Sequence, residues 1–225
     1  STLKLWNLEG SLVSDPFKGH TRAVSSVAIS SDGRTIVSGG ADNTVQLWDW
    51  QDDLISKPFE GHSNGIFSVT ANNQTIVSGG EDGLIRLWNY TGESTDELRE
   101  GQDGAVLSVA ISHDDIIVSG GEDWFVKRWD RQGELIRPPL EGHTDIVRTI
   151  DLSPDGDMIA SGSYDKTVRL WDRQGNLVKP PFEGHSDAVS AVAFDPNGEF
   201  IVSGSWDNTI RKWDLKGNLL ATFTG

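Results

Sequence analysis

The chain repeats itself every 40 to 42 residues, and this period limits the folds open to it more than any other feature. Each repeat contains a tryptophan followed by Asp or Asn. These tryptophans are Trp6, Trp48, Trp88, Trp129, Trp171 and Trp213. Two further markers keep their places: a Gly-His pair, which is Gly-Gln at residues 101–102, and a Ser-Gly-Gly or Ser-Gly-Ser triplet followed by an Asp. One structural unit is therefore repeated along the chain.

Within one period the sequence predicts four short β-strands. Residues 23–30, 34–40 and 43–49 are rich in Val, Ile and Thr, and turn sequences such as SSDG and ADN separate them. A fourth run, residues 53–61, contains Pro58, which has no N–H to donate, so the run fits an outer edge strand. Helical periodicity is not sustained anywhere. Four strands per repeat predict small antiparallel sheets arranged as the blades of a β-propeller.

Composition excludes several classes of function. The 225 residues carry a formal net charge of −15, which disfavours nucleic acid and anionic membrane surfaces as partners. No run of 18 apolar residues is present, so the sequence predicts no membrane-spanning helix. The chain has no cysteine, which excludes disulfides and thiolate metal sites and is compatible with the reducing cytoplasm. We therefore expect a cytoplasmic protein without cofactors.

Residues 142–172, GHTDIVRTIDLSPDGDMIASGSYDKTVRLWD, resemble a repeat of the WD-repeat β-propeller family nearly position for position. The resemblance covers essentially the whole chain. The connection DRQGNLVKPPFEGH at 172–185 is similar to bacterial arrays of the family, notably cyanobacterial ones. The resemblance implies an all-β propeller of four-stranded antiparallel blades. It also implies a non-catalytic protein–protein interaction scaffold that is a module or fragment of a larger bacterial signalling or regulatory protein.

The family pattern also sets blade boundaries, because in it the strand after each tryptophan is the outermost strand of its blade. Residues 1–21 then form an N-terminal half blade that has only the third and fourth strands. The five complete blades are residues 22–61, 62–101, 102–142, 143–184 and 185–225, all in one propeller domain. This leaves the ring incomplete unless further residues or another chain complete it. We therefore expect either a longer parent chain or self-association through the open half blade.

Four residues per repeat match the family's structural tetrad, which implies that Asp accepts a hydrogen bond from His, His bonds to Ser, and Ser accepts from the Trp indole N–H. These residues are His20, Ser38, Asp42 and Trp48; His62, Ser78, Asp82 and Trp88; Gln102, Ser119, Asp123 and Trp129; His143, Ser161, Asp165 and Trp171; and His185, Ser203, Asp207 and Trp213. Each bond contributes about 0.5–1.5 kcal/mol net to stability. Since Gln102 replaces the histidine, we expect the third relay to be the weakest.

The Ser, His and Asp of each tetrad have the composition of a hydrolase triad. Ser and Asp recur in every blade and His in four of the five, whereas an active site does not recur, so we expect no catalytic residue among them. Each blade supplies at most one histidine to its own loop, so we also expect no metal site.

Two rows of positions vary between repeats while the tetrads do not. In the family, the residue before the turn Asp points to the loop face at the top of the propeller, and the residue two after Gly-His lies nearer the channel. We expect the positions that contact a partner to be Trp206, Tyr164, Glu81, Glu122, Arg22, Asp145, Asp187 and Trp124. The acidic residues and the adjacent aromatics favour a protein or peptide, basic and partly apolar. The alternative is that Tyr164 and Trp206 only cover apolar loop surface.

Three other functions compete with the scaffold. Trp206 could stack on a sugar, which gives a carbohydrate or small-ligand binding propeller. The chain could be a repeat-assembly fragment with no activity of its own. An enzyme using paired carboxylates, such as Asp145 and Asp187, ranks lowest because the sequence offers no nucleophile or metal cluster. The basic residues Arg169, Arg211 and Lys212 are expected to be solvated strand positions rather than an anion site.

Overall fold

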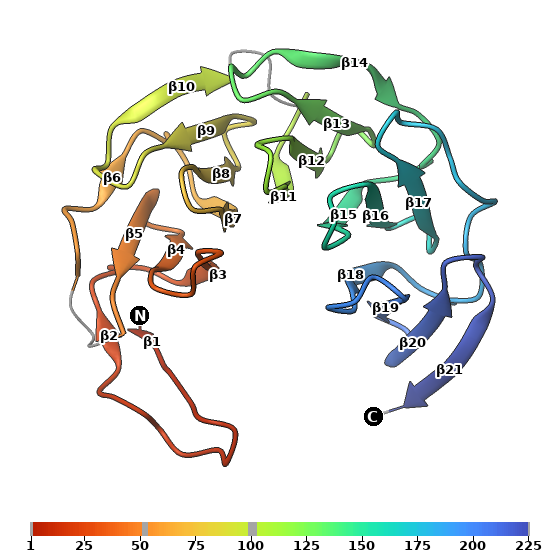
Figure 1. The fold of residues 1–225 in the computed structure, drawn as a ribbon, viewed down its shortest axis with the longest axis horizontal. Coiled ribbons are helices and arrows are strands. Elements are labelled where there is room, and N and C mark those ends of the chain that lie inside the picture. The colour runs from red at the N-terminus through yellow and green to blue at the C-terminus, as the bar shows by residue number, and fades with distance from the viewer. Residues whose placement is uncertain (1, 51–53, 99–102, 225) are drawn as a thin grey trace. The chain divides into compact units, whose positions relative to one another are not determined.

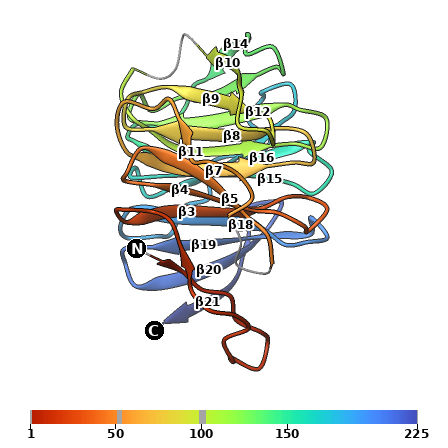
Figure 2. The same ribbon diagram turned by 90° about the vertical axis from the view of Figure 1, so that its left-hand side faces the viewer.

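The computed structural model describes residues 2–50, 54–98 and 103–224. Every helix or strand assigned in these ranges is a β-strand (Figures 1 and 2). The chain divides into two compact units, Ser1–Gly101 and Gln102–Gly225. Each unit consists of antiparallel sheets whose strands follow one another in chain order. The predicted all-β class and the four-stranded antiparallel blades are therefore confirmed, while the grouping of all blades into one domain stays a prediction.

The first unit contains a two-stranded sheet and two four-stranded sheets. The two-stranded sheet pairs β1 (Thr2–Leu3) with β2 (Phe17–Lys18). The next sheet contains β3 (Val24–Ile29), β4 (Ile36–Gly40), β5 (Thr44–Trp48) and β6 (Phe59–Glu60). The third contains β7 (Ile66–Ala71), β8 (Ile76–Gly80), β9 (Ile85–Trp88) and β10 (Ser94–Leu98). Strand β6 is shorter than the run 53–61 that the sequence suggested.

The second unit contains three sheets. The first contains β11 (Val106–Ile111), β12 (Ile117–Gly121), β13 (Val126–Trp129) and β14 (Leu135–Leu140). The second contains β15 (Val147–Leu152), β16 (Met158–Ser163) and β17 (Val168–Asp172). The third contains β18 (Val189–Phe194), β19 (Phe200–Ser205), β20 (Thr209–Asp214) and β21 (Leu219–Thr224).

The sheet of β15, β16 and β17 has two isolated bridges in place of a fourth strand. Leu177 bridges to Trp171, and Phe182 bridges to Val168. The residues between the two bridges include two prolines, at positions 180 and 181, which have no N–H to donate to a ladder. The outer segment of this sheet pairs through single bridges, although β14, with prolines at positions 138 and 139, forms a strand whose register shifts between Val126 and Arg128.

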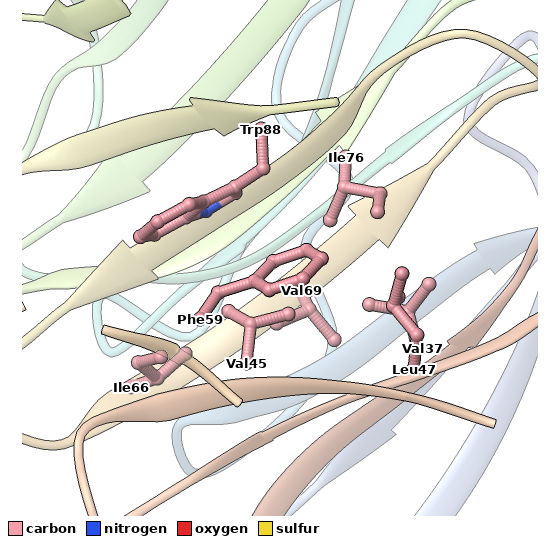
Figure 3. Close-up of a cluster of buried hydrophobic side chains, with 8 residues drawn as sticks. All are labelled: Val37, Val45, Leu47, Phe59, Ile66, Val69, Ile76 and Trp88. Atoms are coloured by element: carbon pink, nitrogen blue, oxygen red, sulfur yellow. The ribbon is translucent and has the colours of Figure 1, made fainter. Parts of the chain in front are cut away.

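The core lies between the faces of adjacent sheets. Figure 3 shows one such cluster in the first unit, where Phe59 packs beside Trp88 with ring centroids 5.6 Å apart. The whole cluster consists of Val37, Val45, Leu47, Phe59, Ile66, Val69, Ile76 and Trp88. The second unit has the same kind of cluster between its second and third sheets, where Phe182 packs on Trp213. Burying such apolar side chains provides the main stabilisation of the stacked sheets.

The first strands of adjacent sheets are also joined by side-chain hydrogen bonds. Ser26 Oγ accepts from the amide of Val69 at 3.1 Å, and Ser108 Oγ accepts from the amide of Ile150 at 3.0 Å. Close approach of the sheets further requires glycine at residues 39, 120 and 162, each the second residue of a Ser-Gly pair. A Cβ added to Gly162 would lie 2.6 Å from a methyl carbon of the next sheet. The repeated Ser-Gly sequence is therefore needed for packing between blades.

Candidate interaction surface

The tetrad residues form hydrogen-bonded relays. In the second unit, His143 Nδ1 lies 2.7 Å from Asp165 Oδ2, and His143 Nε2 lies 2.8 Å from Ser161 Oγ. The indole N–H of Trp171 donates to the same serine oxygen at 2.9 Å. Since the carboxylate can only accept, Nδ1 carries the proton and Nε2 accepts the serine hydroxyl. The relay therefore runs in one direction, from the indole through Ser and His to Asp.

The same relay is present in three other blades. The histidines His20, His62 and His185 lie 2.9 Å from their carboxylates and 2.7 to 2.8 Å from their serine oxygens. Each aspartate also accepts the backbone amide of the residue after its histidine. The tetrad serines are fully buried, so their hydroxyls cannot reach a substrate. The relays satisfy buried polar groups and hold the loops in place.

Burial and hydrogen bonding shift the pKa values of the relay groups. Burial lowers the pKa of His62 and of His143, and the facing carboxylates only partly offset this effect. Burial alone would raise the pKa of Asp82 and of Asp165. Hydrogen bonds and charge interactions with the histidines nevertheless hold both below the usual range. At neutral pH the histidines are therefore neutral and the aspartates ionised.

The third repeat has a different set of contacts around its aspartate. Trp129 still donates to Ser119 Oγ at 2.9 Å. Lys127 Nζ lies 2.7 Å from Asp123 Oδ2. Gln102 lies outside the described residues, so the expectation that this relay is the weakest stays a prediction.

In every blade, the residue before the turn aspartate has the same backbone position. Each amide donates to the carbonyl of the residue three after the His or Gln marker. The donors are Ala41, Glu81, Glu122, Tyr164 and Trp206, at 2.8 to 3.1 Å. A fixed backbone with a variable side chain is the arrangement that a binding surface on a repeated scaffold requires. In the second unit, Glu122 folds back so that its Oε2 accepts the amide of Ala105, which partly occupies this carboxylate.

Tyr164 and Trp206 lie together on the loop face of the second unit. We call them the aromatic pair. Their ring centroids are 5.0 Å apart with an interplanar angle of 50°. Tyr164 is half-buried, whereas 56 % of Trp206 is exposed. The two rings therefore cover each other only in part, and more than half of Trp206 stays exposed to solvent.

Two acidic side chains belong to the loops that are hydrogen-bonded to the aromatic pair. Asp145 Oδ1 accepts the amide of Ile146, and Asp187 Oδ1 accepts the amide of Ala188. The carbonyls of Ile146 and Ala188 in turn accept the amides of the aromatic pair. Each aromatic residue and its carboxylate are thus linked through one short stretch of backbone.

The remaining candidates lie elsewhere on the loops. Arg22 and Glu81 are exposed side chains of the first unit. Trp124 occupies the turn between β12 and β13 with a φ of 70°, a left-handed conformation that bulky side chains rarely adopt. Lys166 lies in the equivalent turn of the next blade, and its Nζ donates to the carbonyl of Ser186 at 2.9 Å. Sequence reasoning missed Lys166, although its place one residue after a turn aspartate was visible.

The expectation that the basic strand residues are solvated is wrong. Arg169, Arg211 and Lys212 are all partly buried. The Arg211 guanidinium carbon lies 6.0 Å from the ring centroid of Trp213, and Lys212 Nζ lies 3.5 Å from the ring centroid of Phe200. Arg211 and Lys212 thus lie over aromatic rings, which shields their side chains in part from solvent.

Comparisons with known proteins agree with this architecture. The family model described as "WD domain, G-beta repeat" matches residues 10–49, 54–89, 92–130, 133–172 and 176–214. A search of curated proteins gives no significant match. In the part of the chain that the structure describes, no three His, Cys, Asp or Glu side chains come together as a metal site. Within the same residues, no helix is long and apolar enough to cross a membrane.

Proposed function

Because the chain belongs to the WD-repeat family, we propose that it is a non-catalytic scaffold whose aromatic pair anchors a basic, partly apolar peptide. WD-repeat domains typically bind proteins or peptides and are typically non-catalytic. We further propose that the chain is one module of a larger bacterial regulatory protein, the role expected from the sequence of residues 172–185. The observation that carries the binding site is the exposure of Trp206 beside Tyr164.

The chemistry of the aromatic pair suits an anchor. Trp and Tyr offer a large contact area with few rotatable bonds, so little conformational entropy is lost when a partner packs on them. The scaffold does not require either residue, because the equivalent positions hold Ala41, Glu81 and Glu122. Architecture alone therefore does not account for the pair.

The charge around the pair favours a cationic partner. Asp145 and Asp187 lie in the loops that hold the two aromatic residues. A Lys or Arg side chain over an exposed indole gains about 0.5–1 kcal/mol, and more when it is desolvated. Lys166 is engaged by the carbonyl of Ser186, which directs its ammonium group to the protein's own backbone.

A selection from a displayed peptide library on the immobilised chain tests this proposal. We expect enriched peptides that combine Lys or Arg with apolar residues. The double variant Trp206→Ala plus Tyr164→Ala should bind them at least about tenfold more weakly, because two anchors are lost. The matched control is Trp50→Ala, which removes an exposed tryptophan whose indole N–H donates to the Gly33 carbonyl in the first unit.

The alternatives give different results in the same assay. Equal capture of peptides by the double variant would contradict the proposal. Binding to a glycan panel that Trp206→Ala alone abolishes would instead support the carbohydrate function. If neither library contains a binder, the chain behaves as a repeat array without binding activity.

A further inference from the structure

The chain contains two Asn-Gly pairs, Asn64-Gly65 and Asn197-Gly198. In this dipeptide an asparagine side chain reacts most readily with its own backbone, because glycine has no side chain to obstruct the approach. Both asparagines are exposed, and both glycines are half-buried. Residue type and exposure therefore do not distinguish the two pairs, and a difference in reactivity must come from the hydrogen bonds of their loops.

The turn that contains Asn197 and Gly198 is held by Asp195. The amide of Gly198 donates to the Asp195 carbonyl at 2.9 Å, and the amide of Asn197 donates to the carboxylate Oδ2 at 3.1 Å. Asp195 Oδ1 also accepts the amide of Phe200 at 2.8 Å. The Gly198 nitrogen thus keeps its proton in a hydrogen bond and is held in place, which prevents it from approaching the neighbouring side chain as a nucleophile.

Asn64 and Gly65 lie directly before β7 and have no such turn. The loop is fixed on either side, because the Ser63 amide donates to Asp82 Oδ2 and the Gly65 carbonyl accepts the amide of Glu81, both at 2.9 Å. Among the residues that the structure describes, neither the Asn64 side chain nor the Gly65 amide has a hydrogen-bond partner. A Cβ added to Gly65 would come no closer than 3.5 Å to another atom. The Gly65 nitrogen is therefore unengaged and uncrowded.

The equivalent loops of the second unit carry a carboxylate where the first unit has Asn64. Asp145 Oδ1 accepts the amide of Ile146 at 2.7 Å, and Asp187 Oδ1 accepts the amide of Ala188 at 2.8 Å. Conversion of Asn64 to aspartate would give the unpaired amide that follows it the same kind of acceptor. The loop is thus compatible with the acid at this position.

We propose that Asn64 is a site of spontaneous deamidation in the folded chain, whereas Asn197 is protected. Hydroxide removes the Gly65 amide proton, and the nitrogen attacks Cγ of Asn64. The new N–C bond forms as the bond to the side-chain nitrogen breaks, and this nitrogen takes a proton from water and leaves as ammonia. The product is a five-membered succinimide.

Water then opens the succinimide at either of its two carbonyls. Cleavage of the bond between Cγ and the Gly65 nitrogen gives aspartate, and cleavage at the backbone carbonyl of residue 64 gives isoaspartate. The sum consumes one water, releases one ammonia and needs neither an oxidant nor a reductant. One negative charge is added at the second residue after His62, in the row of loop positions that vary between blades.

A time course on the full chain at neutral pH tests the proposal. Samples taken over several weeks are cleaved after glutamate at mildly acidic pH, which slows further deamidation. Peptides 61–81 and 184–199 then report the two pairs. Mass spectrometry with fragmentation assigns the mass difference between amide and acid to one asparagine. We expect deamidation at Asn64 to be at least about tenfold faster than at Asn197.

Concentrated urea provides the control for the effect of structure. Unfolding breaks the hydrogen bonds to Asp195, so the two pairs should react at similar rates. A difference between Asn64 and Asn197 that persists in urea would assign their reactivity to the neighbouring sequence and would contradict the proposal.

The variant Gly65→Ala tests the attacking nitrogen. Alanine occupies the equivalent position in three other blades, so the fold should be retained, which circular dichroism checks. The added methyl group hinders ring closure, and deamidation at Asn64 should slow at least about tenfold. Asn197 in the same sample is the internal control and should react at its former rate. Equal rates at the two pairs in the folded chain, or an unchanged rate at Asn64 in Gly65→Ala, would overturn the proposal. Neither result bears on the aromatic pair of the second unit.

Discussion

Two tryptophans of one hairpin, Trp213 on β20 and Trp206 in the turn that precedes it, have opposite environments. Trp213 is 1 % exposed, and its indole N–H donates to Ser203 at 2.8 Å. Trp206 is mostly exposed and contacts only part of the ring of Tyr164. Residue type is the same, so position within the repeat decides whether a tryptophan supports the fold or forms surface. Residues of the hydrogen-bonded relay and residues of the loop face can therefore be substituted independently of each other.

The largest expected effect is the difference in stability between the alanine variants of the two tryptophans. Trp213→Ala should lower the free energy of unfolding by about 3–5 kcal/mol, because it leaves a cavity and removes one of the two hydrogen bonds of Ser203. Trp206→Ala should change it by no more than about 0.5 kcal/mol, as for most surface substitutions. Urea unfolding followed by circular dichroism measures both. Similar losses in the two variants would show that Trp206 is a structural residue after all.

Acidification should weaken the relays and leave the aromatic pair unaffected. The pKa values of His62 and His143 in the folded chain lie below the ordinary 6.5, so below pH 6.5 the unfolded chain binds more protons than the folded one. Stability is therefore present above pH 6.5 and is lost as the pH falls, by up to about 1.4 kcal/mol per pH unit for each histidine. The lowered pKa values of Asp82 and Asp165 extend this loss below pH 3.8.

Urea midpoints between pH 7.5 and 5 test the effect of pH. Trp206→Ala should keep the dependence of the unchanged chain. His143→Gln should reduce the slope, since it removes one titrating group and introduces the residue that the third repeat carries at this place. A slope that His143→Gln does not alter would assign the pH dependence to other groups.

A further comparison concerns Trp124, which is exposed like Trp206 but lies on a left-handed backbone. Asn43 and Asn208 occupy the equivalent turns with φ values of 68° and 65°. Because asparagine adopts this conformation more readily, Trp124→Asn should raise the free energy of unfolding by up to about 1 kcal/mol. The same urea titration measures it. A loss of stability would mean that packing of the Trp124 side chain outweighs the backbone strain.

The repeat made the fold class and the hydrogen-bonded tetrads predictable, because strand pairing and relay contacts depend on spacings within one period. Contacts between one repeat and the next were harder to predict from the sequence. The partial burial of Arg211 depends on Gly184, which belongs to the preceding connection and leaves room for the guanidinium group. The turn of Glu122 back onto the Ala105 amide likewise depends on the local path of a loop.

The outer strands show a further limit of sequence reasoning. Pro58 correctly indicated a weak outer strand, but the length of β6 depends on where individual bridges form. The contact within the aromatic pair follows from adjacency of two blades, which the period implied. Its 5.0 Å ring separation depends on the twist of the sheets and could not be derived from spacing.

The hydrogen bonds from backbone amides to hydroxyl oxygens between inner strands affect where the chain tolerates insertions and deletions. Each bond fixes the position of one sheet relative to the next through a single Ser or Thr near the middle of the inner strand. Among the residues that the structure describes, no such bond involves an outer strand, and the outer strands there range from single bridges to six residues. Insertions and deletions are therefore best accommodated at the periphery, so new loops can be added there without disturbing the alignment of the blades.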